Sequence, residues 1–287
     1  MDTQYEPSNP LSMPFDCFEY DSEKDAFPIR EHWHYFSELL MAEEGTLMVQ
    51  QGDTLHRVTP GEILFINPQN HHSIDSQNGE HVRYLVIKLD LNQLSEIPSY
   101  APDLRTMMLE AERLRIPMHL SAKDVSEYHM DFMVRQCVQE CTEQQYAYDL
   151  KVRALLYLIA TALVRILIRD GFSAEPGTTK ADPLYSITHY VDQHIRENLK
   201  VEELARYCGL SYPWFARRFR EMYGIGCKEY IEKVRISKVE HYLLFTDYDL
   251  RYISRETGYA DCSHMIKDFR RLMGTTPGQF RQERKKT

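Results

Sequence analysis

The chain has 287 residues, of which 43% are hydrophobic and 27% charged, so two globular domains with separate cores are possible. Its six cysteines have no CxxC spacing, which argues against a disulfide framework or a zinc ribbon. The longest apolar run, residues 154–164, is too short to cross a bilayer, and the acidic residues Asp2, Glu6 and Asp16 do not suit a signal peptide. We therefore expect a cytoplasmic protein without a membrane partner.

The net charge of −9 argues against nucleic-acid binding only until it is divided along the chain. Residues 1–182 carry 15 Lys and Arg against 29 Asp and Glu, whereas residues 183–287 carry 19 against 14. Phosphate binding requires a basic surface, which only the second part can offer. DNA contact is therefore expected from residues 183–287 and not from the acidic part.

The pattern of residues 27–90 predicts short strands separated by turns. Apolar runs at residues 47–50, 63–66 and 83–88 alternate with turn signals that contain Gly45, Gly52, Gly61 or Pro68. Regular short strands of this kind are typical of a β-barrel or jelly roll. The first part of the chain is therefore predicted to be a β-barrel.

Several ionisable residues are expected inside this barrel. If residues 32–40 form one strand, its period of 2 places His32, His34, Phe36 and Glu38 on one face. His72 follows at the spacing of a second strand pair. Ionisable side chains are costly in such an interior unless they are paired or serve a ligand. The pattern thus indicates a binding pocket.

The spacing of these residues resembles the first motif of the cupin fold, which is His-x-His, three residues, Glu, six residues and Gly, here Gly45. The resemblance implies four metal ligands, His32, His34, Glu38 and His72. Three imidazoles and a carboxylate suit a divalent transition metal. In the second cupin motif this sequence departs from the pattern, because Gln69 replaces the usual glycine.

Three interpretations of the cluster stay open. The four side chains hold a metal, or they bind a small effector directly together with Phe36, or they only pack the barrel. In either binding interpretation Phe65 also lines the pocket, whereas Trp33 and Tyr35 point the other way.

Helical patterns follow the barrel at residues 125–145 and 148–169. The second has apolar residues at heptad-like spacing, including Leu150, Leu155, Leu158 and Ile166. Helices of this kind pack on the barrel, and they also offer a surface for dimerisation. Residues 171–182 contain Gly, Pro, Ser and Thr and are expected to be a flexible linker, and residues 184–199 a helix.

One sequence pattern, which predicts one structural unit, occurs twice between residues 200 and 283. Residues 204–210 recur as 253–259 at an offset of 49, and residues 215–224 recur as 265–274 at an offset of 50. Each copy predicts a helix, a turn at Gly209 or Gly258 that needs positive φ, and a second helix that begins after Ser211 or Asp261. This is the pattern of a helix-turn-helix, in which the second helix enters the DNA major groove.

The outward faces of the two second helices are the candidate DNA-binding surfaces. Between the copies, residues 228–245 predict a helix roughly 27 Å long, which would hold the two reading helices about one DNA turn apart. Arg217 is the best candidate for a bidentate contact to guanine, with Lys267 as its counterpart. The candidate contacts are Tyr212, Pro213, Ala216, Arg217, Arg220, Cys262, Ser263, Ile266, Lys267 and Arg270.

Residues 201–281 resemble the DNA-binding domain of AraC/XylS-type transcriptional regulators. The most specific part of the resemblance is the closing run Gly274-Thr275-Thr276-Pro277 with Phe280-Arg281. Arg218 departs from the pattern, because an apolar residue usually stands there, and it could add a phosphate contact. The resemblance implies a homodimer that binds promoter DNA and responds to a sugar or related metabolite. An activator that contacts RNA polymerase is expected, and a repressor stays open as the alternative.

The predicted fold is thus multidomain α+β. We expect a cupin-like sensor barrel at residues 1–92, a helical dimerisation segment at 93–170, a linker at 171–182, and an all-α domain with two helix-turn-helix motifs at 183–287. The expected function is ligand-responsive, sequence-specific DNA binding without catalysis. The alternative is a cupin metalloenzyme with an accessory DNA-binding module, which leaves the two basic helices without a role.

Overall fold

The computed structural model describes residues 4–5, 15–34, 36–91, 104–114, 116, 118–173, 184 and 187–284. The chain divides between residues 173 and 184 into two compact units, and each is described by itself. Among the described residues, no helix combines the length and apolar character needed to cross a membrane.

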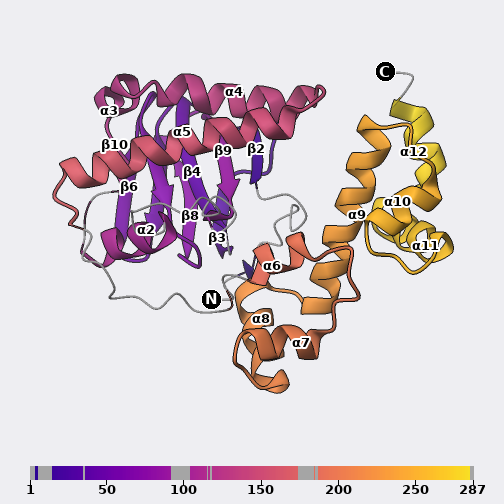
Figure 1. The fold of residues 1–287 in the computed structure, drawn as a ribbon. Helices are drawn as coiled ribbons and strands as arrows, with labels where there is room; N and C mark the ends of the chain where they lie inside the picture. Colours follow the sequence, from indigo (N-terminus) through magenta and orange to yellow (C-terminus); the bar gives the residue numbers. More distant parts are fainter. Residues whose placement is uncertain are drawn as a thin grey trace. The chain divides into compact units, whose positions relative to one another are not determined.

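The first unit is a β-sandwich of two five-stranded sheets (Figure 1). One sheet has the order β1 (Gln4–Tyr5), β3 (Ile29–Trp33), β8 (His72–Ser76), β5 (Leu47–Gln51) and β6 (Thr54–Val58). The other has the order β10 (His119–Leu120), β7 (Ile63–Ile66), β4 (Ser37–Glu44), β9 (Arg83–Leu89) and β2 (Phe15–Asp21). An apolar core that includes Leu40, Val49, Ile74 and Val86 fills the space between the sheets, as in a flattened form of the predicted barrel.

The expectation that residues 32–40 form one strand is wrong. β3 ends at Trp33 and β4 begins at Ser37, and the two strands belong to different sheets. Residues 36–42 are all buried, because the core covers one face of β4 and helices cover the other. A strand buried on both faces shows no alternation, so its beginning could not be read from period 2.

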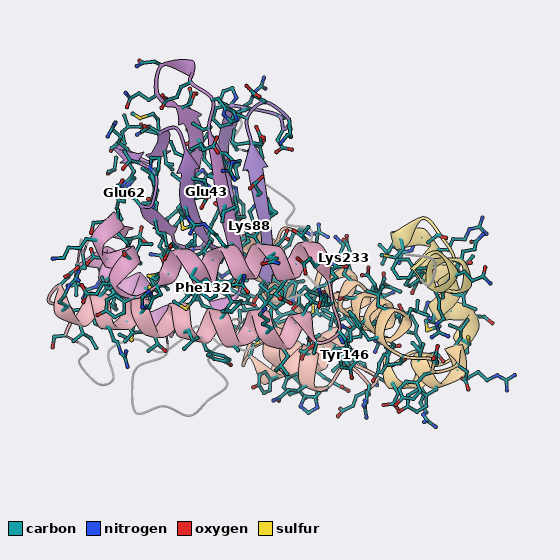
Figure 2. The ribbon with its side chains drawn as sticks, turned by 90° about the horizontal axis from the view of Figure 1, so that it is seen from above. Glu43, Glu62, Lys88, Phe132, Tyr146 and Lys233 are labelled. Atoms are coloured by element: carbon teal, nitrogen blue, oxygen red, sulfur yellow. The ribbon has the colours of Figure 1, made fainter. Side chains whose placement is uncertain are left out.

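Helices cover the outer face of the β10-β7-β4-β9-β2 sheet. α2 (Leu104–Arg113) and α3 (Ala122–Glu127) are short, and α4 (Met130–Glu143) and α5 (Tyr148–Arg169) lie side by side across the strands (Figures 1 and 2). The helix expected at residues 125–145 is interrupted at His129, which has a φ of 55°. The bounds of α5 match the predicted helix, and Ile159, Leu163 and Ile166 of the predicted stripe are buried. Leu150 and Leu158 are instead exposed, because Val152 and Leu156 face the sheet in their place.

The second unit contains only helices among its described residues: α6 (Ile187–Gln193), α7 (Val201–Tyr207), α8 (Tyr212–Tyr223), α9 (Cys227–Phe245), α10 (Leu250–Glu256), α11 (Cys262–Met273) and α12 (Pro277–Arg284). α7 with α8 and α10 with α11 are the two helix-turn-helix units, and α9 joins them as predicted (Figure 1). α6 is shorter than the helix expected at 184–199, because turns follow from His194. Residues 174–182 of the expected linker lie outside the described residues.

The two helix-turn-helix units have separate apolar cores. In the first, Phe215 and Phe219 of α8 are fully buried, and Phe219 packs against Tyr223 and Tyr230. In the second, Met265 and Phe269 of α11 are buried against Ile253 and Val239. The i, i+4 core positions predicted from the repeat are therefore confirmed.

Candidate functional site

The glycine turns have the backbone that the helix-turn-helix pattern requires. Gly209 has a φ of 67° and Gly258 a φ of 78°, in the left-handed region that glycine tolerates. Gly224 and Gly274 end α8 and α11 with φ of 71° and 74°. Both recognition helices therefore begin and end at equivalent positions of the repeat.

The structure exposes most of the predicted contact residues on α8. Tyr212, Pro213, Arg217 and Arg220 are exposed and Ala216 is half-buried. Pro213, Arg217 and Arg220 lie on the side of α8 away from the buried phenylalanines. Tyr212 and Pro213 are in the first turn, from which helix-turn-helix proteins contact base edges, whereas Arg220 is in the last turn.

The corresponding face of α11 is less exposed. Ser263, Lys267 and Arg270 are exposed, whereas Cys262 and Ile266 are half-buried and pack against the core of their unit. α11 therefore offers two cations and a hydroxyl to a ligand, with little apolar surface.

Trp214 was missed from the sequence and is a candidate contact residue. Its side chain is 44% exposed on the first turn of α8. The guanidinium carbons of Arg217 and Arg218 lie 5.9 and 5.6 Å from the centre of its ring, which is within cation–π range. Glu221 lies 3.8 Å from Arg217 and 3.6 Å from Arg218. In the sequence, a tryptophan three residues before Arg217 is the signal that could have indicated a ring stacked on that guanidinium.

Asp268 of α11 is a second residue that the sequence pattern did not single out. It is buried, and its carboxylate lies 3.2 Å from Arg271 and 3.4 Å from His264, while Arg271 also reaches Glu232 of α9 at 3.0 Å. These ion pairs tie α11 to α9 beside the candidate reading face. Nothing in the helical pattern separates such a buried aspartate from an exposed one.

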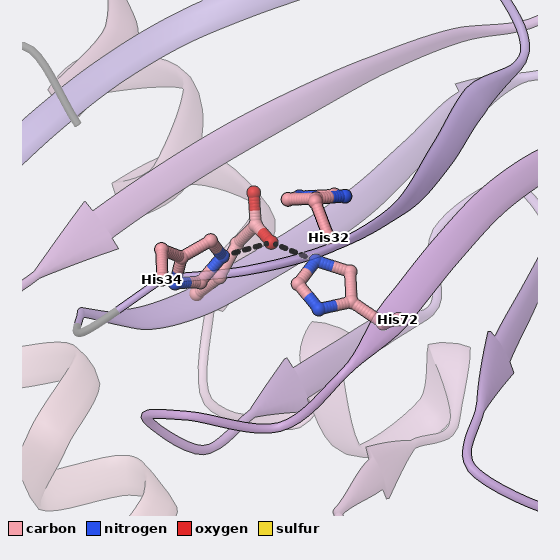
Figure 3. A group of neighbouring side chains, drawn as sticks. His32, His34 and His72 are labelled. Atoms are coloured by element: carbon pink, nitrogen blue, oxygen red, sulfur yellow. Dashed lines mark hydrogen bonds and ion pairs between the residues drawn. The ribbon is translucent and has the colours of Figure 1, made fainter. Parts of the chain in front are cut away.

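In the first unit, the four ionisable residues predicted for the pocket converge (Figure 3). His32 comes from β3, His72 from β8, Glu38 from β4, and His34 from the connection between the two sheets. One ligand-type atom from each lies within 4.8 Å of the others, and all four side chains are buried. Glu38 Oε2 lies 3.1 Å from His34 Nε2 and 3.0 Å from His72 Nε2.

Backbone carbonyls orient all three imidazoles. His32 Nδ1 donates to the Arg30 carbonyl, His34 Nδ1 to that of Phe36, and His72 Nδ1 to that of Asn70, each at 2.9 Å. A carbonyl can only accept, so in each neutral ring the proton lies on Nδ1 and Nε2 carries a lone pair. Histidines that ligate metals are oriented by the same kind of hydrogen bond.

Burial opposes ionisation of Glu38, but the positive charge of Lys88 and the contacts with His34 and His72 outweigh it and hold the Glu38 pKa well below its usual value. For His72, burial lowers the pKa, but the hydrogen bond to Glu38 outweighs it and the net shift is upward. Both shifts favour a cation beside an ionised Glu38.

These residues fit a metal ion. The lone pairs of His34 Nε2 and His72 Nε2 both face Glu38 Oε2. Each nitrogen repels that oxygen unless a proton or a metal ion lies between the two atoms. Ligand atoms about 3 Å apart are what bonds of about 2.1 Å produce at neighbouring coordination positions. A divalent ion would satisfy all four residues while the imidazoles stay neutral.

The other residues predicted for the pocket differ in their placement. Phe36 is buried, and its carbonyl orients His34. Phe65 lies on the opposite face of its sheet, where it lines an apolar cavity with Leu39 and Leu156 of α5, so its assignment to the same interior as the histidines is wrong. The Trp33 ring lies 6.3 Å from that of the exposed His71. Tyr35 lies outside the described residues.

Comparison with known proteins gives matches to both units. A family model described as an AraC-like ligand binding domain matches residues 12–160, and one described as a helix-turn-helix domain matches residues 204–283. The HTH-type transcriptional activator RhaS of Klebsiella pneumoniae (strain 342) is 24% identical over 268 residues, which cover 91% of this chain and 90% of that protein.

Solved structures of two regulators are also similar. The DNA-binding domain of AdpA in complex with a target DNA is 26% identical, with a TM-score of 0.35, covering 36% of this chain and 93% of that one. Apo ToxT from Vibrio cholerae is 15% identical, with a TM-score of 0.43, covering 94% and 97%. On its two matching domain models, the chain belongs to the AraC family of ligand-responsive, helix-turn-helix transcription regulators.

Proposed function

We propose that this protein binds promoter DNA as a homodimer and activates transcription when a small ligand occupies its N-terminal unit. The observation that carries the proposal is the repeated basic face, in which Arg217 and Arg220 of α8 correspond to Lys267 and Arg270 of α11. The activating role is supported by relatives named as transcriptional activators. A contact to RNA polymerase is proposed together with that role.

The DNA-binding part is tested by selecting sites from randomised duplex DNA with the full-length protein. Two recognition helices joined by one helix suit successive major grooves, so each protomer should select a motif in two parts about 10 base pairs apart. Binding that falls with salt but enriches no motif would contradict sequence-specific recognition.

The dimeric state is supported by exposed apolar residues along α5. Leu150 and Leu158 are 67% and 56% exposed, and Ile168 follows on the same side of the helix. On the neighbouring α4, Phe132 is 60% exposed (Figure 2). Exposed apolar residues that continue over two adjacent helices are typical of an interface between proteins.

Changing Leu158 to Lys tests the dimer. A charge on the α5 surface should shift the protein toward the monomer in analytical ultracentrifugation, because an unpaired ammonium is costly in an apolar interface. Thr54→Lys on β6, an exposed position of the other sheet, is the matched control and should leave the mass unchanged. Equal masses for both variants would exclude this surface.

The ligand site is proposed to be His32, His34, Glu38 and His72, holding a divalent transition metal. Imidazole and carboxylate donors suit zinc, copper, iron or nickel. When bound, the metal would supply a Lewis-acid position for an oxygen donor of a polar effector such as a sugar or related metabolite. The chain's own groups orient the imidazoles and keep Glu38 ionised.

Metal analysis of the purified protein tests this site. The wild-type chain should carry about one equivalent of a transition metal and His34→Ala should carry none, because a deleted ligand weakens the site. His71→Ala is the matched control, since His71 is an exposed neighbour outside the cluster. Negligible metal in the wild type, with an inducer response that His34→Ala blunts, would favour direct effector binding.

We also propose that the chain is not an enzyme. A cupin metalloenzyme with an accessory DNA-binding module should turn over its substrate when loaded with metal. The metal-loaded protein is expected to leave candidate cupin substrates unchanged, and turnover that His34→Ala abolishes would support the enzyme instead.

A further inference from the structure

The turn between β7 and β8 connects two of the site histidines. The Gln69 amide donates to the His34 carbonyl at 2.8 Å, and the Asn70 carbonyl accepts from His72 Nδ1 at 2.9 Å. Gln69 holds a φ of 67°, a left-handed conformation that a non-glycine residue adopts only under constraint. The turn is therefore bonded to the His72 imidazole and to the backbone that carries the His34 imidazole.

The opposite side of the turn is held by α2. Asn67 Nδ2 donates to Glu112 Oε2 at 2.7 Å and to the Met108 carbonyl at 3.2 Å, and Asn70 Nδ2 donates to Glu112 Oε1 at 2.8 Å. Glu112 thus uses both carboxylate oxygens to hold the two asparagines. Asn67 is buried, and among the described residues its Oδ1 has no hydrogen-bond partner, so its orientation depends on α2.

α2 in turn packs against the apolar layer beneath α5. Met107, Met108 and Ala111 are buried, and Leu104 lines the same apolar cavity as Leu156. Packed helices transmit small displacements because their interiors resist compression. Hydrogen bonds therefore lead from His72 through Asn70 and Glu112 to a helix that contacts α5.

We infer that Glu112 is a positioning residue that couples occupancy of the histidine site to α2. The inference rests on the proposed metal site. A metal that draws His34 and His72 toward Glu38 would fix the turn, and the turn would fix the Glu112 carboxylate and the end of α2. By linkage, loss of the Glu112 contacts must weaken metal binding by the factor by which metal binding strengthens them.

The test is a Co²⁺ titration of full-length, metal-free protein, followed by visible absorption and by hydrogen exchange of α2 amides. Glu112→Gln keeps the shape but removes one of the two acceptors and the negative charge. Groups bonded directly to a metal ligand change affinity by about 10–100-fold, and Glu112 is one hydrogen bond further away, so Co²⁺ should bind about tenfold more weakly, at the lower end of that range. The absorption spectrum at saturation should stay that of the wild type, because all four ligands remain. Co²⁺ should slow α2 exchange in the wild type and much less in Glu112→Gln.

Two further variants complete the test. Glu110→Gln is the control, since Glu110 lies on the same helix and pairs with Arg113 at 2.7 Å, away from the turn. Asn70→Ala removes only the amide that reaches Glu112 and leaves the carbonyl that orients His72, so it should weaken Co²⁺ binding in the same direction even if Glu112→Gln folds poorly. In that case the Co²⁺ affinity of Asn70→Ala decides whether the coupling exists.

Wild-type affinity together with wild-type protection of α2 in Glu112→Gln and Asn70→Ala would overturn the coupling and leave the metal site standing. Failure of the wild-type chain to take up Co²⁺ would overturn the proposed metal site and the coupling with it. Weaker binding in both variants, with Glu110→Gln unchanged, supports the inference.

Discussion

The two helix-turn-helix units share one sequence pattern, yet their turns are anchored differently. A Cβ on Gly209 would meet no heavy atom within 4 Å, whereas on Gly258 it would lie 2.0 Å from the Ile195 carbonyl oxygen. Arg235 of α9 holds the same segment, because its guanidinium donates to the Glu197 carbonyl at 2.9 Å. The second turn is packed against residues that follow α6, while the first is exposed.

Helix capping separates the units in the same way. Asp249 accepts from the Tyr252 amide and Asp261 from the His264 amide, each at 2.8 Å, so both helices of the second unit are capped by a side chain. In the first unit, Lys200 and Ser211 stand at the N-caps without a side-chain hydrogen bond. The repeated sequence pattern thus determines the shape of each unit. The packing around its turn and the capping side chains of its helices determine how stable each unit is.

The largest expected difference follows from the two glycines. Gly258→Ala combines positive φ with a backbone clash and should lower the free energy of unfolding of the second unit by roughly 2–5 kcal/mol. Gly209→Ala meets only the conformational penalty, about 1–2 kcal/mol. Native-state hydrogen exchange of α11 and α8 amides measures the two effects locally.

Equal losses in the two alanine variants would show that the clash at Gly258 is relieved by a shift of residues 195–197. In that case Arg235→Ala should also be mild, because the segment it holds would already move freely.

Arg217→Ala and Lys267→Ala sharpen the comparison on the DNA side. Arg217 is placed beside Trp214 and can make a bidentate contact to guanine, so its loss should weaken binding by about 1–3 kcal/mol and relax preference at one base. Lys267 offers a single point of contact and should matter less. Sites selected from randomised DNA by each variant provide the measurement.

Arg220→Ala and Arg270→Ala are the controls for this experiment, since contacts to phosphate should weaken all sequences alike. An unchanged preference profile for Arg217→Ala would mean that another face of α8 reads the bases.

The two helix-turn-helix units could be predicted from the sequence, because the turn glycines and N-cap residues of both copies are close together in the chain. The offset of 49 before the turn and 50 after it locates one extra residue, and the structure has it between Gly258 and Cys262, where Tyr259 is buried. The capping role of Asp261 was confirmed. Ser211 stands at the predicted N-cap position, but its side chain makes no capping hydrogen bond.

The histidine cluster was predicted for a partly wrong reason. The spacing His-x-His-x₃-Glu predicts one strand face, but the four side chains meet because the chain crosses between two sheets after Trp33. The clamp from Glu112 to Asn67 and Asn70 could not be predicted at all. It joins residues 45 and 42 positions apart, and only the packing of α2 brings them together.

The smallest expected difference concerns the caps. Asp261→Ala removes the acceptor for the His264 amide and should destabilise the second unit by about 1 kcal/mol, whereas Ser211→Ala, which removes no hydrogen bond, should change the first by no more than a few tenths. Asp261→Asn is the control, because asparagine caps as well without the charge. Hydrogen exchange in the first turns of α11 and α8 reports each cap separately. If Ser211→Ala cost as much as Asp261→Ala, Ser211 would cap α8 in solution, and the contrast between the units would rest on the glycine turns alone.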